Sequence, residues 1–162
     1  RACAEWTDEA AWIGISNFNC PGNLTVAGDA ELIEAAGPVF MEMGAHKVVP
    51  LLNVAGAWHC PMLDEAAEAF SHYISERTFG PATVPIIDNV TGGYLPNDAE
   101  KLKAALAAQI NCAVRWDVGI QTMIDSGIDT FYEVGHGDML SRMGLFITRK
   151  AKFLPTSRWH SA

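Results

Sequence analysis

The chain has 162 residues, of which 49% are hydrophobic and 19% charged. This composition excludes an intrinsically disordered protein, and the length suits one domain with its own core or a piece of a larger domain. The formal net charge of −8, without a long Lys/Arg run, argues against a nucleic-acid partner. No apolar stretch approaches the roughly 20 residues that a membrane helix requires, so we expect no membrane association.

The cysteines indicate a reducing compartment. Cys3, Cys20, Cys60 and Cys112 are widely spaced and form no Cys-x-x-Cys pair, which argues against a zinc site. A disulfide framework is typical of smaller secreted proteins, and the first residues show no signal peptide. We therefore expect reduced thiols, no bound metal and a cytoplasmic location.

Apolar runs, turn residues and caps predict a β-β-α-β unit after residues 1–10, which we expect to be a helix end or a linker. The expected elements are the strands Trp12–Phe18 and Leu24–Gly28, which we expect to pair as a hairpin, a helix from the N-cap Asp29 to about Met43, and the strand Lys47–Val54. Gly44 ends the helix, and one of its faces carries Leu32, Ile33, Ala36, Val39 and Phe40. This order corresponds to the last two-thirds of a ferredoxin-like βαββαβ module. Its opening strand and helix are not in the sequence.

The rest of the chain predicts alternating helices and strands. The expected elements are a helix from Pro61 to about Arg77, a buried strand Ile86–Val90, a helix from Asn97 or Asp98 through Ile110, a helix Trp116–Ser126 that Gly127 ends, a strand Thr130–Val134 and a helix from Met139 to about Lys150. Such alternation is typical of a parallel α/β sheet. Two strands do not complete an open parallel sheet, so we expect further strands to come from elsewhere.

His59 lies at the predicted junction of a strand and a helix. Pro61, two residues later, suits the first helical position because it has no N–H to leave unpaired there. Rigid elements on both sides make this a good position for a general base. On the residues alone, a structural histidine is the simpler interpretation. Cys60 is adjacent, but neighbouring side chains point apart, so we do not expect a Cys-His dyad.

Five short motifs follow one another over nearly the whole chain. They are NFNCPGN at 17–23 with VAG at 26–28, GAWHCPM at 56–62, VPIIDNVTG at 84–92, QINCAVRW at 109–116 and YEVGHGDML at 132–140. In this order they resemble motifs of the malonyl-CoA:acyl carrier protein transacylases of fatty-acid synthesis and of the related acyltransferase domains of polyketide synthases. The resemblance covers roughly the C-terminal half of that family. His136 departs from it, because the family usually has Pro at this position.

The resemblance implies an α/β fold that combines part of an α/β-hydrolase-like large subdomain with most of an inserted ferredoxin-like small subdomain. On this basis, residues 1–54 form the partial ferredoxin-like subdomain, residues 55–152 the C-terminal part of the large subdomain, and residues 153–162 a tail. The family's Gly-His-Ser-x-Gly motif, which carries the nucleophile, does not occur in the sequence. Its upstream glutamine and its malonyl-binding arginine also lack counterparts. We therefore expect a fragment that is inactive alone and that pairs with the missing N-terminal half.

The resemblance implies catalytic roles for His59 and Gln109. The family's histidine takes the proton from the attacking serine, and an imidazole suits this task because its unperturbed pKa lies near neutrality. A backbone carbonyl orients that histidine, and Gln109 occupies the matching position. The Gln109 side chain is expected to matter little. The alternative interpretation of Gln109 is a surface residue at a helix end.

The resemblance also places Trp58, Asn17, Asn19 and Asn89 near the substrate. In the polyketide domains an aromatic residue before the histidine accompanies malonyl selection, because a bulky ring leaves no room for an α-methyl group. Trp58 as a core residue is the alternative. Asn17 and Asn19 lie at the strand end that faces the family's cleft, although an Asn in a turn also satisfies its own backbone. The same ambiguity applies to Asn89.

The first functional hypothesis is therefore malonyl transfer from malonyl-CoA to the phosphopantetheine thiol of acyl carrier protein. No metal or redox cofactor is implied. A second hypothesis is a non-catalytic fragment or binding module, which the missing nucleophile motif favours. A third is a piece of a polyketide synthase acyltransferase domain, which flanking ketosynthase sequence would distinguish.

Overall fold

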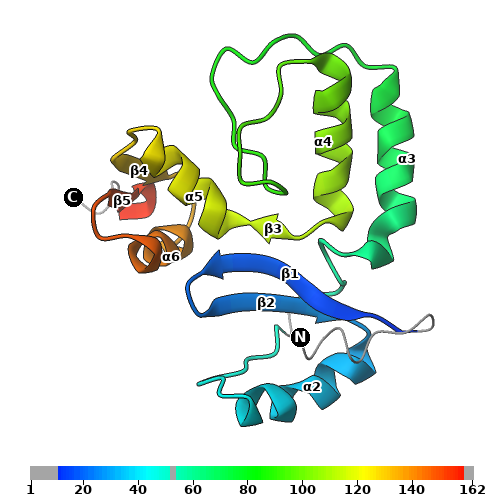
Figure 1. Ribbon diagram of the computed structural model, residues 1–162, viewed down its shortest axis with the longest axis vertical. Helices are drawn as coiled ribbons and strands as arrows, with labels where there is room; N and C mark the ends of the chain where they lie inside the picture. The colour runs from blue at the N-terminus through cyan, green and yellow to red at the C-terminus, as the bar shows by residue number, and fades with distance from the viewer. Residues whose placement is uncertain (1–10, 52–53, 159–162) are drawn as a thin grey trace.

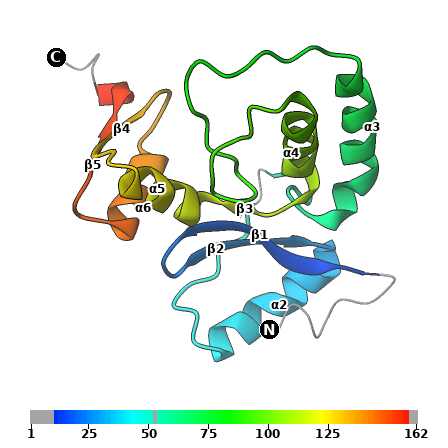
Figure 2. The same ribbon diagram turned by 45° about the horizontal axis from the view of Figure 1, so that its top comes forward.

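The computed structural model of the chain describes residues 11–51 and 54–158. The strands in this part form two sheets. One is three-stranded, of order β2 (Asn23–Gly28), β1 (Ile13–Cys20) and β3 (Val114–Arg115), and the other pairs β4 (Thr130–Glu133) with β5 (Lys152–Pro155). Figures 1 and 2 show α2 (Ala30–Glu42) on one side of the β1–β2 hairpin and α3 (Asp64–Ser75) and α4 (Ala99–Asn111) on the other side. The expectations for residues 1–10, 52–53 and 159–162, which include Cys3, lie outside the described residues. The α/β class predicted from the sequence is confirmed.

The predicted hairpin is confirmed. Strand β1 spans Ile13–Cys20 and pairs antiparallel with β2, which spans Asn23–Gly28. Pro21 and Gly22 form the turn between them, and Gly22 has a φ of 77° that favours glycine. Two irregularities in the register interrupt the pairing, one between Ile15 and Asn17 and one between Phe18 and Cys20.

A third strand, which the sequence did not predict, joins this sheet. Strand β3 is only Val114–Arg115 and pairs parallel with β1 through Asn17 and Phe18. The Arg115 guanidinium lies 4.5 Å from the centre of the Phe18 ring, a cation–π contact that adds to the two paired residues. β1 and β3 come from opposite sides of the predicted domain boundary at residues 54 and 55, yet they share one sheet. The division into domains stays a prediction.

Helix α2, Ala30–Glu42, agrees with the predicted helix and its buried face. The positions that the sequence placed on one face are all buried or half-buried, namely Leu32, Ile33, Ala36, Val39 and Phe40. The predicted N-cap Asp29 makes no side-chain bond to the helix and instead accepts a hydrogen bond from the Trp12 N–H at 2.7 Å. The start of α2 is thereby tied to the start of β1.

Helices α3 and α4 form an antiparallel pair that supports the candidate site. A 3-10 turn, η1 at Pro61–Leu63, leads into α3 at Asp64–Ser75, and α4 spans Ala99–Asn111. Figures 1 and 2 show the two helices side by side. Each end of the pair is fixed by a hydrogen bond. The Asn111 amide donates to Asp64 Oδ1 at 2.8 Å, and Lys103 Nζ donates to the Ser75 carbonyl at 2.8 Å.

Two of the predicted strands are wrong. The described residues of Lys47–Val54 form no strand, and their apolar side chains are exposed, Leu51 by 58%. A strand requires a neighbour, and within the described residues both edges of β1 are already taken by β2 and β3. Ile86–Val90 also forms no strand. Ile87 makes only an isolated antiparallel bridge with Tyr94, which follows the next turn of the chain.

The C-terminal part forms a parallel pair of strands with helices, as expected from the alternation. Its elements are α5 at Trp116–Asp125, β4 at Thr130–Glu133, α6 at Met139–Ile147, β5 at Lys152–Pro155 and η2 at Thr156–Arg158. β4 and β5 pair parallel, and the stacked rings of Phe131 and Phe153 lie 4.8 Å apart. Residues 153–155 were predicted to belong to a tail, and they lie in β5 instead. The strand ends at Pro155, and proline argues against a strand in the sequence pattern.

The buried core of the described residues is small. Its apolar members are Ile13, Cys20, Ala36, Cys60, Ala67, Ile74, Ile120 and Ala151. Many large apolar side chains are exposed instead, including several in or next to β4 and those of Val48, Val49, Leu51 and Val54. Within residues 11–51 and 54–158, no helix is long and apolar enough to cross a membrane.

Glu133, the last residue of β4, caps the beginning of α6. Its two carboxylate oxygens accept hydrogen bonds from the Leu140 N–H at 3.0 Å and the Ser141 N–H at 2.8 Å. Burial by itself would raise the pKa of Glu133, but hydrogen bonds from Ser141 and Leu140 and the charge of Arg142 outweigh it and hold the pKa below its ordinary value. The ionised carboxylate is therefore the form that the folded chain favours.

We expect Glu133→Gln to destabilise the chain at neutral pH and the difference from the unmodified chain to disappear in acid. Glu133 has a lower pKa when folded, so its contribution is fully present above the unfolded pKa of about 4.3 and is lost as the pH falls through the folded pKa. Urea unfolding at a series of pH values measures this. Glu68→Gln, on an exposed position of α3, is the control. A Glu133→Gln difference that stays constant from neutral pH into acid would contradict the prediction.

Candidate functional site

His59 adopts a backbone conformation that side-chain-bearing residues rarely take. Its φ is 58°, and it is the one residue other than glycine with a positive φ in the described part of the chain. The left-handed region costs such a residue about 1–2 kcal/mol. Cys60, which precedes a proline, is extended as that position requires, and Pro61 then begins η1. Such strain is concentrated at functional sites, so the backbone marks His59 independently of its chemistry.

The His59 ring is held by the end of helix α4. Nδ1 of His59 lies 2.7 Å from the main-chain oxygen of Gln109. Gln109 is in the last turn of α4, where carbonyl groups have no partner within the helix. A carbonyl only accepts, so Nδ1 donates and the neutral ring keeps its lone pair on Nε2. The half-buried ring can therefore accept a proton at Nε2 while its other nitrogen stays bonded.

The other catalytic assignment made from the sequence, Gln109, thus lies where the predicted role needs it. The structure brings His59 and Gln109 together from positions 50 residues apart. Their catalytic roles stay predictions. The side chain of Gln109, which was expected to matter little, accepts a hydrogen bond from the Asn89 amide at 3.3 Å. No local sequence signal indicated this contact between Asn89 and Gln109.

The residues on either side of His59 differ in solvent exposure. Trp58 is 56% exposed, and its indole lies against Gly56, where an added Cβ would meet the ring at 3.4 Å. Trp58 is thus not a core residue in this structure, and its contact with substrate stays a prediction. Cys60 is 1% exposed, and its thiol donates to the Ala57 carbonyl at 3.2 Å. Burial raises the pKa of Cys60, so the neutral thiol is favoured there.

Asn17 and Asn19 lie on β1, and their side chains bond within the hairpin region. The Asn19 amide donates to Asn23 Oδ1 at 2.9 Å and to Thr25 Oγ1 at 3.1 Å. Asn17 Oδ1 accepts from the Ser16 hydroxyl at 2.8 Å. These hydrogen bonds do not reach His59. Substrate contacts by Asn17 and Asn19 stay predictions, and the hairpin bonds support the alternative that they stabilise the turn region.

No metal centre is formed by the described residues. Within residues 11–51 and 54–158, no group of three or more His, Cys, Asp or Glu side chains is arranged to hold a metal ion. Cys20, Cys60 and Cys112 are free thiols. That no metal or redox cofactor is required stays a prediction.

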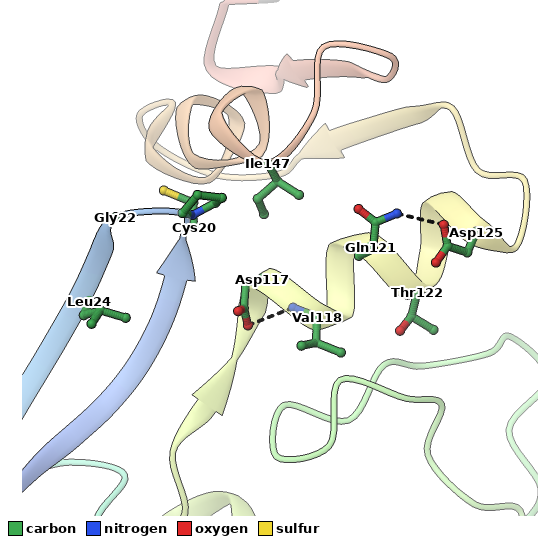
Figure 3. Close-up of a pocket in the computed structure, with 10 residues that line it drawn as sticks. Cys20, Gly22, Leu24, Asp117, Val118, Gln121, Thr122, Asp125 and Ile147 are labelled. Atoms are coloured by element: carbon green, nitrogen blue, oxygen red, sulfur yellow. Dashed lines mark hydrogen bonds between the residues drawn. The ribbon is translucent and has the colours of Figure 1, made fainter. Parts of the chain in front are cut away.

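A surface hollow of about 530 Å³ lies apart from these residues. Figure 3 shows it between the β1–β2 turn, α5 and α6, with Cys20, Leu24 and Ile147 among its lining side chains. Two of its polar side chains are paired with each other. The Gln121 amide donates to Asp125 at 2.7 Å. His59 is not part of its lining, so we base the candidate site on the geometry of His59 and Gln109.

Comparison with known proteins gives a consistent set of relatives. The malonyl CoA-acyl carrier protein transacylase of Bacillus subtilis is 31% identical over 151 residues, which are 93% of this chain and 47% of the relative. No protein-family model matches the chain.

Two solved structures have the same fold. An acyl carrier protein S-malonyltransferase from Vibrio cholerae superposes with a TM-score of 0.88 at 29% identity, over 95% of this chain and 49% of that one. A malonyl-transacylase in complex with its type II polyketide synthase acyl carrier protein superposes with a TM-score of 0.89 at 26% identity, over 99% of this chain and 53% of that one.

The chain spans about half the length of these relatives. The matched half holds the five motifs, the strained His59 and the carbonyl of Gln109 that faces it. These matches relate the chain to the malonyl CoA-acyl carrier protein transacylases, and it fits a C-terminal portion of that family.

Proposed function

We propose that this chain supplies the general base of an enzyme that transfers malonyl from malonyl-CoA to the phosphopantetheine thiol of acyl carrier protein in fatty-acid biosynthesis. The observation that carries the proposal is the His59 Nδ1 to Gln109 oxygen distance of 2.7 Å, made by a histidine with a φ of 58°. A positioned imidazole with a free Nε2 is what such a transfer requires.

In the proposed reaction a serine outside this chain attacks the malonyl thioester, and His59 takes the serine proton. His59 then returns that proton to the coenzyme A sulfur as the thioester bond breaks. In the second half, His59 takes the proton of the carrier thiol, which attacks the malonyl-serine ester, and the serine oxygen recovers a proton. The Gln109 carbonyl stays bonded to Nδ1 throughout, which holds the ring in one orientation. No redox change occurs, and the reaction requires no metal.

The finer assignments belong to the same proposal. Trp58, exposed next to His59, forms a wall of the acyl pocket and favours malonyl over methylmalonyl because its ring leaves no room for an α-methyl group. The hairpin with α2 belongs to a ferredoxin-like subdomain, and α3 to β5 belong to an α/β-hydrolase-like one. The likeness to a malonyl-transacylase of a type II polyketide synthase favours a second candidate, the same transfer in polyketide synthesis.

The test is intact-protein mass spectrometry of the chain with malonyl-CoA. We expect no malonyl adduct on the chain alone, because the proposed nucleophile lies elsewhere. Adding the half of the Bacillus subtilis relative that this chain does not match, together with its acyl carrier protein, should place one malonyl group on the carrier. A stable adduct on the chain alone would show that its own nucleophile reacts and would overturn the assignment. No transfer by the combined halves would favour a non-catalytic binding module.

A further inference from the structure

The Gln109 residue that faces His59 is itself held by a second residue. Its main-chain oxygen lies 2.7 Å from His59 Nδ1, and its side-chain Oε1 accepts a hydrogen bond from Asn89 Nδ2 at 3.3 Å. The two groups of one residue thus connect His59 to Asn89. Asn89 was predicted from the sequence to contact substrate, but its amide is turned toward Gln109.

Asn89 is well fixed at its own backbone. Its carbonyl accepts a hydrogen bond from the Arg115 N–H of β3 at 2.6 Å. Asp88, just before it, is 4% exposed and accepts hydrogen bonds from the Val90 N–H at 3.1 Å and from the Thr91 hydroxyl at 2.7 Å. A residue anchored on both sides can hold a neighbouring side chain without moving itself.

Gln109 needs such support because of its place in α4. Helix ends fray, and the carbonyls of the last turn lack partners within the helix. The α4 helix ends at Asn111, and Cys112 is already extended. A Gln109 side chain held from Asn89 restricts rotation of this last turn, so the carbonyl keeps facing Nδ1.

We propose that Asn89 is a positioning residue whose amide holds Gln109 so that the Gln109 carbonyl keeps His59 in the tautomer protonated at Nδ1. This inference rests on the proposed function for its importance in catalysis, where a free Nε2 is needed. It predicts a property of the chain itself, which can be measured without turnover.

The test is the His59 tautomer of the ¹⁵N-labelled chain, read from its ring-nitrogen chemical shifts at a pH where the ring is neutral. Asn89→Leu keeps the approximate shape of the side chain and removes the donor. We expect the ratio of the Nδ1-protonated to the Nε2-protonated tautomer to fall about fivefold, the equilibrium change that one hydrogen bond supports. Gln109→Leu should give the same fall, and the double variant should fall no further.

Two further variants separate positioning from general loosening. Gln109→Glu keeps an oxygen that accepts from Asn89 and should preserve the tautomer ratio. Asn111→Leu removes the bond to Asp64 at the same helix end and should also leave the ratio unchanged. An unchanged ratio in Asn89→Leu overturns the proposal, as does an equal fall in Asn111→Leu. Should Asn89→Leu fail to fold, Gln109→Leu decides in the same way.

The outcomes for the two proposals are distinguishable. A tautomer ratio that responds to Asn89→Leu, with no malonyl transfer by the combined halves, supports the positioning role and overturns the proposed function. Transfer by the combined halves, with a tautomer ratio that does not respond to Asn89→Leu, supports the proposed function and overturns the positioning role.

Discussion

Replacing His59 by alanine is expected to lower malonyl transfer by the combined halves by about 10²–10⁴-fold, the contribution typical of a positioned general base. The reason is the loss of the ring whose Nδ1 is bonded to Gln109 and whose Nε2 remains free. The measurement is the rate at which malonyl appears on the acyl carrier protein. The proposed base acts in the chemical step, so the loss should appear mainly in kcat.

The control must separate the lost base from the strained backbone, because alanine also disfavours the φ of 58°. His59→Asn serves this purpose, since asparagine adopts the left-handed region more readily. We expect it to fold and to lose transfer as fully as His59→Ala. His59→Gly should be more stable than His59→Ala by about 1–2 kcal/mol. Transfer by His59→Asn within tenfold of the unmodified protein would show that another group is the base.

Gly92→Ala is expected to destabilise the chain by about 2–5 kcal/mol, combining the cost of a left-handed alanine with that of overpacking. Gly92 has a φ of 69°, and an added Cβ would lie 2.6 Å from the Val118 side chain and 3.0 Å from the Gly119 N–H. Val118 and Gly119 are part of α5, so the clash cannot be relieved by moving one flexible side chain. Chemical denaturation measures the loss as a lower transition midpoint.

Gly93→Ala is a matched control one residue away. There an added Cβ meets the Thr91 hydroxyl at 3.5 Å, an ordinary contact, and the backbone carries no positive φ. We expect it to unfold near the midpoint of the unmodified chain. The Gly92 variant should also lose the His59 tautomer preference, since the turn that begins at Asp88 carries Asn89. Equal midpoints for the two alanine variants would refute the packing argument.

The sequence was informative where a signal is local. The amphipathic period of α2 identified its buried face. Asn97 or Asp98 was predicted to start α4, and the Asp98 carboxylate accepts a hydrogen bond from the Lys101 N–H at 2.9 Å. Gly44 and Gly127 were recognised as helix ends, and both have positive φ. Each of these features depends on residues within one or two turns of each other.

Prediction from the sequence failed where a strand depends on a neighbour that is distant in the chain. Lys47–Val54 and Ile86–Val90 have the apolar, β-branched composition of strands, but composition does not supply a pairing edge. β3 is a strand of two residues because it meets β1, which lies about 100 positions earlier, and nothing local marks it. The same limit applies to the candidate site. Its residues were named through family resemblance, whereas the left-handed backbone of His59 and the Asn89 contact depend on tertiary structure.

The separation of His59 and Gln109 in the chain has a consequence for folding. Their hydrogen bond closes a loop of 50 residues, so its formation carries an entropic cost of about 3.5 kcal/mol before any packing is gained. Neither α3 nor α4 orients the imidazole alone. The helices must first dock along each other, with Asn111 on Asp64 at one end and Lys103 on Ser75 at the other. The oriented histidine is therefore a product of late tertiary assembly, and a partly folded chain with both helices formed still lacks it.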